Sequence, residues 1–374
     1  MYSDKSDFAL RKIFIEEAKK IVIKVGTRLL TDTFVVSQII SQIAYLKSQK
    51  KEIILVSSGA VGLGMKTLNL IKRPNELSKI QALAAIGQSK LMSLYEKEAG
   101  NFGFHCAQIL LGSDDLNNRQ RHLNVMNCLN ALLKMEILPI INENDSVSVD
   151  ELKFGDNDSL AALIAVMTRA DLTIILTTVD GLMSSLNSDG KLIPIVRKID
   201  SSIKGLASDT NDKDVSIGGM STKIKAAQIV TASGEPLLIA NGKTPNIIQK
   251  IFSLEEEGTL FVPSKKQINS KKRWLGFFSK SKGKLYVDDG AVKAIKEKNK
   301  SLLPSGIKKI SGNFETGDTI DICSINGDVF ARGLVNYNSK ELLSILGKKS
   351  SEIYSILGYI GDDEIVHKDN LTLI

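Results

Sequence analysis

The chain has 374 residues, of which 43% are hydrophobic and 24% are charged, with 28 Gly and 7 Pro. This composition is typical of a globular protein and excludes a disordered, collagen-like or low-complexity chain. The net charge is +7, and the longest apolar runs, such as 160–167, are far shorter than the roughly 20 residues that a membrane-spanning helix needs. At roughly 150 residues per domain, the length predicts two domains.

The first 19 residues are expected to form an N-terminal extension ahead of the first strand. Apolar and charged residues are mixed there at helical spacing, which predicts a short amphipathic helix and no secretory signal. The three cysteines, Cys106, Cys128 and Cys323, are far apart and never form a C-x-x-C pair. This usage favours a reducing, cytoplasmic location and argues against a structural metal site.

Strand and helix signals alternate through the first 260 residues. Apolar runs of the buried-strand type occupy 21–25, 53–56, 137–141, 172–176 and 236–240. Helical patterns occupy 37–47, 77–98, 115–134, 159–168 and 221–232. This alternation predicts an α/β fold, a three-layer αβα sandwich with a mainly parallel sheet. Ligands of such folds bind at the carboxyl ends of the strands, so the residues that follow each strand are the candidates for function.

The pattern changes after about residue 262. Residues 263–273 are polar and lysine-rich and are expected to form a linker. Beyond them, short alternating segments with intervening glycines (284–287, 307–310, 319–322 and 329–334) predict a small, mostly-β barrel, and helical patterns return at 339–347 and 350–357. The expected domains are therefore 20–262 and 274–374.

Positive charge is concentrated around the start of the second domain. Between Lys265 and Lys309 there are 14 Lys or Arg and three acidic residues. Such asymmetry fits either a surface that binds a polyanion or a solvated, lysine-rich face. We favour the solvated face.

Polar residues follow the first two strands. Lys24 lies near the end of an apolar strand, a costly position unless its ammonium group reaches an anion. The second strand leads into a Ser/Gly turn, 57–62, that opens a helix with free N–H groups. Together these features predict a cradle for phosphate or carboxylate. The pair Gly62 and Gly64 does not complete a dinucleotide fingerprint, because Thr67 stands where the third glycine would be.

Two acidic and amide-rich segments and one helix start complete the set. Residues 142–145 and 155–158 read Asn-Glu-Asn-Asp and Gly-Asp-Asn-Asp. Two explanations of these polar residues are equally good. They could form turns and helix caps, with Asp158 capping a helix that begins at Ser159, or they could take part in catalysis. Lys223 lies in the first turn of a helix that Ser221 or Thr222 could cap, where its charge opposes the helix dipole unless an anion compensates it.

In order along the chain, these segments resemble the glutamate 5-kinase branch of the amino acid kinase family. The resemblance is carried by Ile23-Lys24-Val25-Gly26-Thr27, Val56-Ser57-Ser58-Gly59-Ala60, Asn142-Glu143-Asn144-Asp145, Gly155-Asp156-Asn157-Asp158 and Gly219-Met220-Ser221-Thr222-Lys223. It continues through 272–274 into a segment similar to a PUA domain, which includes 301–304 and 312–314. The fold that it implies is the amino acid kinase fold followed by a PUA barrel.

The resemblance implies ATP-dependent phosphorylation of the side-chain carboxylate of L-glutamate, the first step of proline synthesis. That carboxylate has an ordinary pKa near 4.3, so it is ionised at neutral pH and needs no general base. Phosphoryl transfer between two anions depends mainly on positioning and on charge neutralisation. Mg²⁺ is expected to bridge the ATP phosphates largely through water, so no dedicated metal site of protein ligands is expected.

The site residues follow from the same resemblance. It implies Lys24 and Lys223 at the phosphates and Asp158 between the two lysines. The residues implied for glutamate are Ser58, Gly59, Ala60, Asn142, Asp145 and Asn157. Those implied for the nucleotide are Lys24, Thr177, Thr178, Ile217, Gly218, Gly219, Met220, Ser221, Thr222 and Lys223.

Two positions depart from the family's pattern. The family has Thr-Asp where this chain has Thr177-Thr178, so a nucleotide contact is weakened or is supplied by a neighbour such as Asp180. Ile217 replaces a family threonine. These changes affect nucleotide contacts and leave the implied reaction as it is.

The resemblance also carries expectations about partners. It implies a homo-oligomer, a dimer or tetramer, and feedback inhibition by proline. RNA binding by the PUA-like segment stays open as a second hypothesis, because its positive charge suits a phosphate backbone. Stacking aromatics are few and gather at one edge (Trp274, Phe277, Phe278 and Tyr286), so we favour a structural or regulatory role.

Overall fold

The computed structural model describes residues 5–30, 33–147, 156–185, 190–208, 219–263, 270–359 and 361–374. The chain divides into two compact units. The N-terminal unit comprises Met1–Leu116 and Gln120–Gln267, and the C-terminal unit comprises Ile268–Ile374 with Asn117–Arg119. Each unit has its own hydrophobic core.

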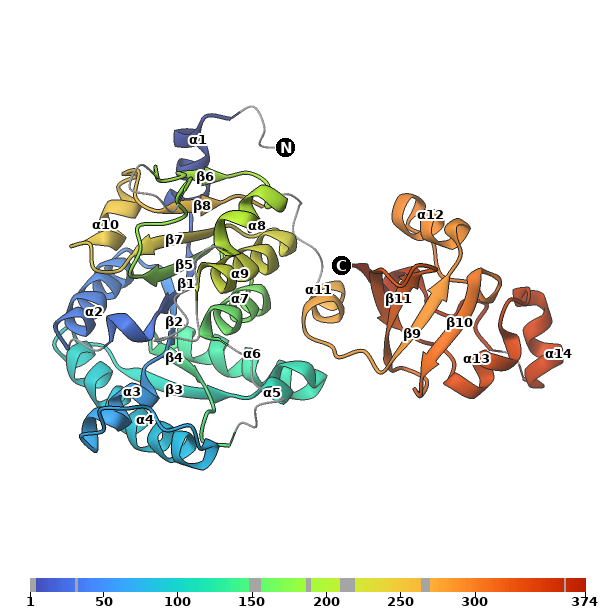
Figure 1. The fold of residues 1–374 in the computed structure, drawn as a ribbon, viewed down its shortest axis with the longest axis horizontal. Helices are drawn as coiled ribbons and strands as arrows, with labels where there is room; N and C mark the ends of the chain where they lie inside the picture. The colour runs from blue at the N-terminus through green and yellow to red at the C-terminus, as the bar shows by residue number, and fades with distance from the viewer. Residues whose placement is uncertain are drawn as a thin grey trace. The chain divides into compact units, whose positions relative to one another are not determined.

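An eight-stranded sheet forms the middle of the N-terminal unit, in the order β3-β4-β2-β1-β5-β7-β8-β6 (Figure 1). The strands are β1 Lys20–Val25, β2 Glu52–Ser57, β3 Cys106–Leu111, β4 Leu138–Glu143, β5 Leu172–Thr177, β6 Ile195–Val196, β7 Leu237–Asn241 and β8 Thr259–Phe261. Neighbouring strands are parallel except β7 and β8, which are antiparallel. The predicted mainly parallel sheet is therefore confirmed.

Helices cover both faces of this sheet (Figure 1). One layer contains α2 Thr33–Ser48, α3 Ala60–Thr67, α4 Leu77–Gly100 and α10 Ile247–Phe252. The other contains α5 Ser113–Asn117, α6 Arg119–Lys134, α7 Asn157–Thr168, α8 Ser201–Ser208 and α9 Met220–Ser233. No helix in the described part of the chain is both long and apolar enough to cross a membrane.

The side chains of β1 point alternately to the two faces of the sheet, and this determines which helix layer Lys24 faces. Ile21, Ile23 and Val25 pack into the core that α2, α4 and α10 share. Because successive strand residues point to opposite faces, Val22 and Lys24 face the other layer. That layer holds α7, which packs against β1.

The N-terminal extension is helical, as its spacing predicts. A short α1 (Asp7–Arg11) runs into a π-helical turn, η1 (Lys12–Glu16). The Arg11 side chain is buried at 1% exposure and donates hydrogen bonds to main-chain carbonyls of residues 194, 255, 257 and 258. The extension is thus attached to the edge of the sheet that β6 and β8 form.

The structure corrects several predicted elements. The expected helix 115–134 is two helices, α5 and α6, that are interrupted at Asn118, where two consecutive asparagines favour a turn. The expected strand 137–141 extends to Glu143, because the Asn142 amide is hydrogen-bonded and can be buried. Strands β3, β6 and β8 were not predicted: β6 and β8 have only two and three residues, and Gln108 interrupts the apolar run of the six-residue β3.

The C-terminal unit is built on a five-stranded sheet in the order β10-β9-β11-β12-β13. Its strands are β9 Gly283–Val287, β10 Ile307–Gly312, β11 Thr319–Ser324, β12 Val329–Leu334 and β13 Leu371–Leu373. Its helices are α11 Ser270–Phe277, α12 Asp289–Lys298, α13 Ser339–Ile345 and α14 Ile353–Leu357. Because α11 begins at Ser270, the last residues of the expected linker are helical; residues 264–269 lie outside the described residues.

Short single-turn elements complete the chain. They are η2 Thr27–Leu29, η4 Pro304–Gly306, η5 Ser350–Glu352 and η6 Lys368–Asn370. The predicted helices 339–347 and 350–357 correspond to α13 and to η5 with α14.

Candidate active site

The predicted site residues gather at the carboxyl ends of the central strands. Lys24 lies near the end of β1, Ser58 follows β2, Asp145 follows β4, and Thr177 ends β5. Helix α3 begins at Ala60, soon after the end of β2, and the first turns of α7 and α9 bring Asp158 and Lys223 together. Parallel strands place these chain segments together, as expected for a ligand site of this fold class.

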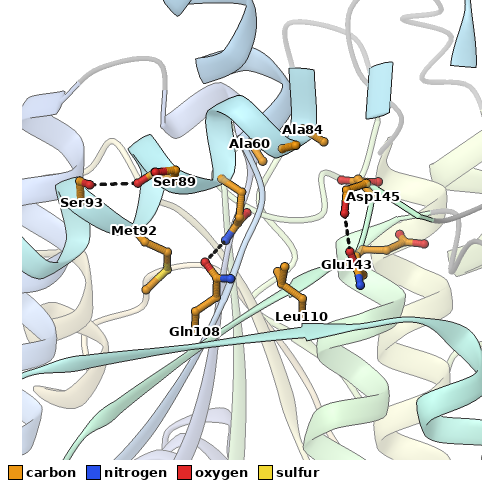
Figure 2. Close-up of a pocket in the computed structure, with 13 residues that line it drawn as sticks. Ala60, Ala84, Ser89, Met92, Ser93, Gln108, Leu110, Glu143 and Asp145 are labelled. Carbon is orange, nitrogen blue, oxygen red and sulfur yellow. Dashed lines mark hydrogen bonds between the residues drawn. The ribbon is translucent and has the colours of Figure 1, made fainter. Parts of the chain in front are cut away.

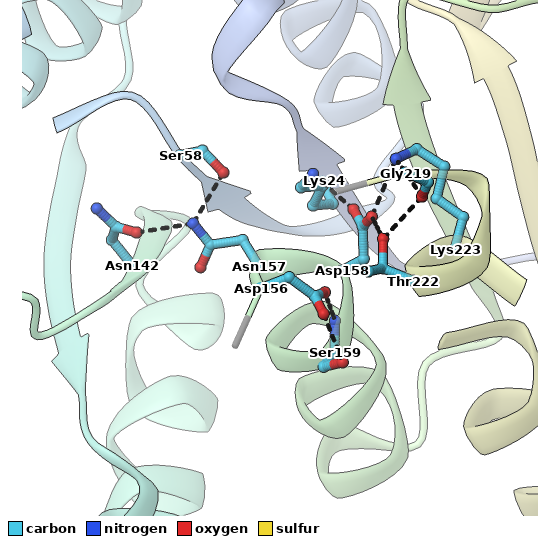
Figure 3. Close-up of polar contacts among 10 residues, drawn as sticks. All are labelled: Lys24, Ser58, Asn142, Asp156, Asn157, Asp158, Ser159, Gly219, Thr222 and Lys223. Carbon is cyan, nitrogen blue, oxygen red and sulfur yellow. Dashed lines mark hydrogen bonds and ion pairs between the residues drawn. The ribbon is translucent and has the colours of Figure 1, made fainter. Parts of the chain in front are cut away.

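Two lysines from distant parts of the chain share one carboxylate (Figure 3). The Nζ of Lys24 lies 2.5 Å from Asp158 Oδ1, and the Nζ of Lys223 lies 3.1 Å from Asp158 Oδ2. The hydroxyl of Thr222 lies 3.0 Å from the same Oδ2 and 2.8 Å from the carbonyl oxygen of Gly219. The first turn of α9 is thereby attached to the first turn of α7.

All three charged side chains are buried: Lys24 is 7% exposed, Asp158 1% and Lys223 5%. Burial by itself would raise the pKa of Asp158, but the two ammonium groups outweigh it and hold that pKa below its ordinary value. Burial and the neighbouring Lys24 lower the pKa of Lys223, although Asp158 opposes this change. One carboxylate therefore faces two ammonium groups, and the cluster carries net positive charge when all three groups are ionised.

Capping is not the role of Asp158. The helix α7 begins at Asn157, and its N-cap is Asp156, whose carboxylate accepts a hydrogen bond of 2.7 Å from the Ser159 N–H. Asp158 lies in the first turn instead, where the helix dipole favours a negative charge. It also supplies the anion that compensates Lys223 at the start of α9.

The cap of α9 also differs from the prediction. Gly219 is its N-cap and makes no side-chain capping bond, so neither Ser221 nor Thr222 caps the helix. The Thr222 hydroxyl has both the Asp158 carboxylate and the Gly219 carbonyl within hydrogen-bond distance as acceptors for its single hydrogen. A residue predicted to cap a helix is therefore part of the charged cluster.

A second polar group lies beside this cluster (Figure 3). The Asn157 amide nitrogen donates to Ser58 Oγ at 2.8 Å and to Asn142 Oδ1 at 3.1 Å. The Asn157 Oδ1 is buried and has no hydrogen-bond partner among the described residues. A buried amide oxygen without a donor is costly, so this atom is suited to receive a donor from a ligand.

The charged cluster opens on a cavity of about 90 Å³. Its lining includes all three charged residues of the cluster, and Ser58 and Asn157 line it as well. The remaining lining residues are Gly26, Thr27, Arg28, Leu29, Asp156, Thr177 and Thr178. Residues predicted for phosphate, for glutamate and for the nucleotide thus meet in one cavity.

Other predicted glutamate residues line a second cavity, of about 490 Å³ (Figure 2). Ala60 and Asp145 are on its wall, together with residues of α4 and β3. Asn142 is 2% exposed and lines neither cavity; it lies behind Asn157. Gly59 is the N-cap of α3 at φ 101°, a left-handed conformation that glycine adopts without strain.

The nucleotide residues are placed in part. Thr177 and Thr178 line the smaller cavity, and 219–223 forms the N-cap and first turn of α9. Ile217 and Gly218 lie outside the described residues, as does Gly155. Asp180 accepts a hydrogen bond of 2.9 Å from the Asn241 side chain.

Sequence reasoning missed two residues that hold the site together. Asp156 caps α7, and Gln88 in the middle of α4 accepts a hydrogen bond of 2.9 Å from the Asn142 side chain. Asp156 was visible within the Gly-Asp-Asn-Asp segment, since a helix was expected directly after it. Nothing in the local pattern distinguishes Gln88 from any other polar helix residue.

Comparison with known proteins identifies the relatives of this chain. The family described as "Amino acid kinase family" matches residues 19–241, and the PUA domain matches residues 283–357. A curated glutamate 5-kinase from Caldanaerobacter subterraneus subsp. tengcongensis is 45% identical, covering 95% of this chain and 98% of the relative. Another, from Geobacter sulfurreducens, is 42% identical and covers 98% and 100%.

A third glutamate 5-kinase, from Marinomonas sp., is 42% identical and covers 96% of this chain and 98% of its own length. The similarity thus extends over both units. The match to the kinase family, residues 19–241, includes the lysine of β1, the Gly-Asp-Asn-Asp segment and the start of α9. The chain belongs to the amino acid kinase family, and within it to the glutamate 5-kinases.

Proposed function

We propose that the chain transfers the γ-phosphoryl group of ATP to the side-chain carboxylate of L-glutamate and so forms glutamyl 5-phosphate. One observation carries the proposal: the ammonium groups of Lys24 and Lys223 meet at Asp158 on the wall of a cavity that Ser58 and Asn157 also line. Two positive charges held at one point are what the transfer of a phosphoryl group between two anions requires.

The two lysines neutralise the phosphate that moves. Glutamate attacks through a carboxylate that is already ionised, because its ordinary pKa is near 4.3. The main obstacle is repulsion between this nucleophile and the ATP phosphates. Lys24 and Lys223 reduce that repulsion, and Asp158 keeps their ammonium groups at a fixed separation without cancelling both charges. No proton needs to be removed from the nucleophile.

The amide group at the other side of the cavity holds glutamate. The buried Asn157 Oδ1, which lacks a donor among the described residues, would accept a hydrogen bond from the substrate ammonium group. Asp145 on the wall of the larger cavity adds a negative charge for the same group. Backbone N–H groups at the start of α3 suit the α-carboxylate. These contacts orient the side-chain carboxylate towards the two lysines.

The nucleotide binds at the side formed by Thr177, Thr178 and the start of α9. Mg²⁺ would bind to the ATP phosphates and would add charge neutralisation when present. Within the described residues, no group of three His, Cys, Asp or Glu side chains forms a metal site. Asp158 is already paired with two ammonium groups, so we do not assign it as a metal ligand.

The experiment is a coupled assay of ADP release from purified protein, with ATP, Mg²⁺ and a panel of acids. Glutamate should support turnover, whereas aspartate and N-acetylglutamate should be nearly inactive. Omission of Mg²⁺ should abolish the activity. Equal rates with another acid of the panel would assign the chain to a different branch of the family.

The proposal extends to the setting of the reaction. The product would feed proline synthesis, the protein would act in the cytoplasm as a dimer or tetramer, and proline would inhibit it. Mass measurement in solution tests the assembly. Adding proline to the same assay tests inhibition, and unchanged rates at millimolar proline would remove that part of the proposal.

A further inference from the structure

A chain of side-chain amides leads from the surface of β3 to the glutamate site. Gln88 Nε2 donates to Gln108 Oε1 at 3.2 Å, and Asn142 Nδ2 donates to Gln88 Oε1 at 2.9 Å. Asn157 Nδ2 in turn donates to Asn142 Oδ1 at 3.1 Å and to Ser58 Oγ at 2.8 Å. Each amide except the last, Asn157, therefore receives a hydrogen bond on its oxygen from the next one along.

One backbone group determines the direction of this chain. The N–H of Glu143 donates to Asn142 Oδ1 at 2.9 Å, and a main-chain N–H is only ever a donor. The Asn142 atom that faces it must be the oxygen, so its NH₂ group faces Gln88. Asn157 must then present its own NH₂ group to Asn142. The Asn157 oxygen therefore points away from Asn142 and the other hydrogen-bonded amides. It is buried and has no donor among the described residues.

Gln88 is placed by a close contact between two helices. A Cβ atom on Gly87 would lie 1.7 Å from the Ala60 carbonyl oxygen, and one on Gly64 would lie 2.0 Å from the Leu83 carbonyl oxygen. Only glycine at these two positions lets α3 and α4 approach this closely. The start of α3, with Ala60, and the Gln88 side chain are thereby held beside the same site. Gly64, which completes no dinucleotide fingerprint, is therefore explained by the packing of α3 against α4.

Gln88 is 8% exposed and Asn142 is 2% exposed. If Gln88 lost its carbonyl oxygen, the buried Asn142 NH₂ group would have no acceptor in this chain of contacts. A buried donor without an acceptor is costly, so the Asn142 side chain would rotate until its NH₂ group reached another acceptor. Its oxygen would then leave Asn157, and the orientation of the Asn157 amide, on the wall of the smaller cavity, would no longer be fixed from this side.

We propose that Gln88 is a positioning residue of the glutamate site: it accepts the Asn142 amide and so keeps the Asn157 oxygen directed at the substrate ammonium group. This assignment rests on the proposed function. Gln88 lines the larger cavity and is not among the residues that line the smaller one, where the two lysines lie. Its loss should therefore weaken glutamate binding and leave ATP binding and the transfer step nearly intact.

The test compares steady-state kinetics of the unaltered protein with Gln88→Met, which keeps the length of the side chain but removes its amide. The KM for glutamate should rise about tenfold, the effect of one ordinary hydrogen bond. The KM for ATP and kcat should change by less than about twofold, because the lysine cluster is untouched. Gln88→Glu retains an acceptor for Asn142 and should restore most of the affinity.

Gln81→Met is the matched control, since the same substitution two turns earlier on α4 lies outside the chain of amides. Gln88→Asn, shorter by one methylene, replaces the methionine variant if that protein does not fold, and its KM for glutamate should also rise. An unchanged KM for glutamate, or an equal rise in the KM for ATP, would overturn the assignment. If the unaltered protein showed no turnover with glutamate, the proposed function would itself fail, and this assignment with it.

Discussion

In the N-terminal unit, Lys24, Asp158 and Lys223 are each less than a tenth exposed, and both lysines pair with Asp158. In the C-terminal unit, the lysines between 280 and 309 are all exposed. An exposed lysine costs little free energy, and its position therefore says little about function. A buried lysine needs a partner, and a carboxylate shared by two lysines leaves positive charge for a ligand. A group of buried charges that share one carboxylate, and not the large number of exposed lysines, marks the candidate active site.

The largest effect should come from Asp158→Asn. Without the carboxylate, two buried ammonium groups repel each other, and kcat should fall by about 100- to 1,000-fold, the usual effect of losing one electrostatic contact in a site. Asp321→Asn is the matched control, because Asp321 is 9% exposed and pairs with Arg332 at 2.7 Å in the other unit. The control should stay within about twofold in kcat. A similar loss of kcat in both variants would contradict the assignment of catalysis to the buried charges of the N-terminal unit.

Lys223→Ala should give the next largest effect. It removes one of the two ammonium groups that face the transferred phosphate, and kcat should fall by about 100-fold. Lys225→Ala, two residues along the same helix and exposed, is its control and should stay near the unaltered rate. Near-normal turnover in Lys223→Ala, measured on folded protein, would remove this lysine from the mechanism.

Arg11→Met tests a buried charge that lies outside the candidate active site. Arg11 donates to carbonyl oxygens at 2.8–3.4 Å. Its loss leaves these acceptors unpaired, so the free energy of unfolding should fall by about 3 kcal/mol. Urea unfolding measures this loss, with the exposed neighbour Lys12→Met as the control. The kcat of the folded variant should be unchanged; a large loss of kcat would give the N-terminal extension a part in catalysis.

The pH dependence of stability should also report the lysine cluster. The folded-state pKa of Asp158 lies below its ordinary value of 3.8. Its contribution to stability is therefore complete above that value and is lost as the pH falls through the lower, folded-state pKa. The difference in unfolding free energy between the unaltered protein and Asp158→Asn should be constant from about pH 5 to 7 and shrink below about pH 4. A constant difference down to pH 3 would contradict the ion pairs.

The smallest effect is expected from RNA. Of the aromatics considered for stacking, Phe278 is 2% exposed and packs inside the C-terminal unit. A mobility-shift titration with generic single-stranded RNA should show only weak binding that disappears at about 150 mM salt, since exposed charge alone is strongly screened there. A persistent shift at that ionic strength would show that the lysine-rich face binds a polyanion.

Periodicity predicted the parallel sheet and most of its helices because both arise from local alternation that the chain repeats several times. The polar segments after β1, β2 and β4 were visible for a similar reason, since dense polar residues after a buried strand need an explanation. Lys24 and Lys223 could each be recognised as electrostatically unusual from their own neighbours. The sequence by itself thus determined the fold class and which residues form the candidate site.

The tertiary structure decided which of these residues touch. Asp158 could cap a helix or bind two lysines, and the choice depends on groups 134 positions before it and 65 after it along the chain. The place of Gln88 depends on two helices that meet through Gly64 and Gly87. Such contacts arise from packing between distant segments, and the energy of a buried charge or amide depends on every partner around it. The local sequence pattern around a residue does not predict which distant residues will contact it.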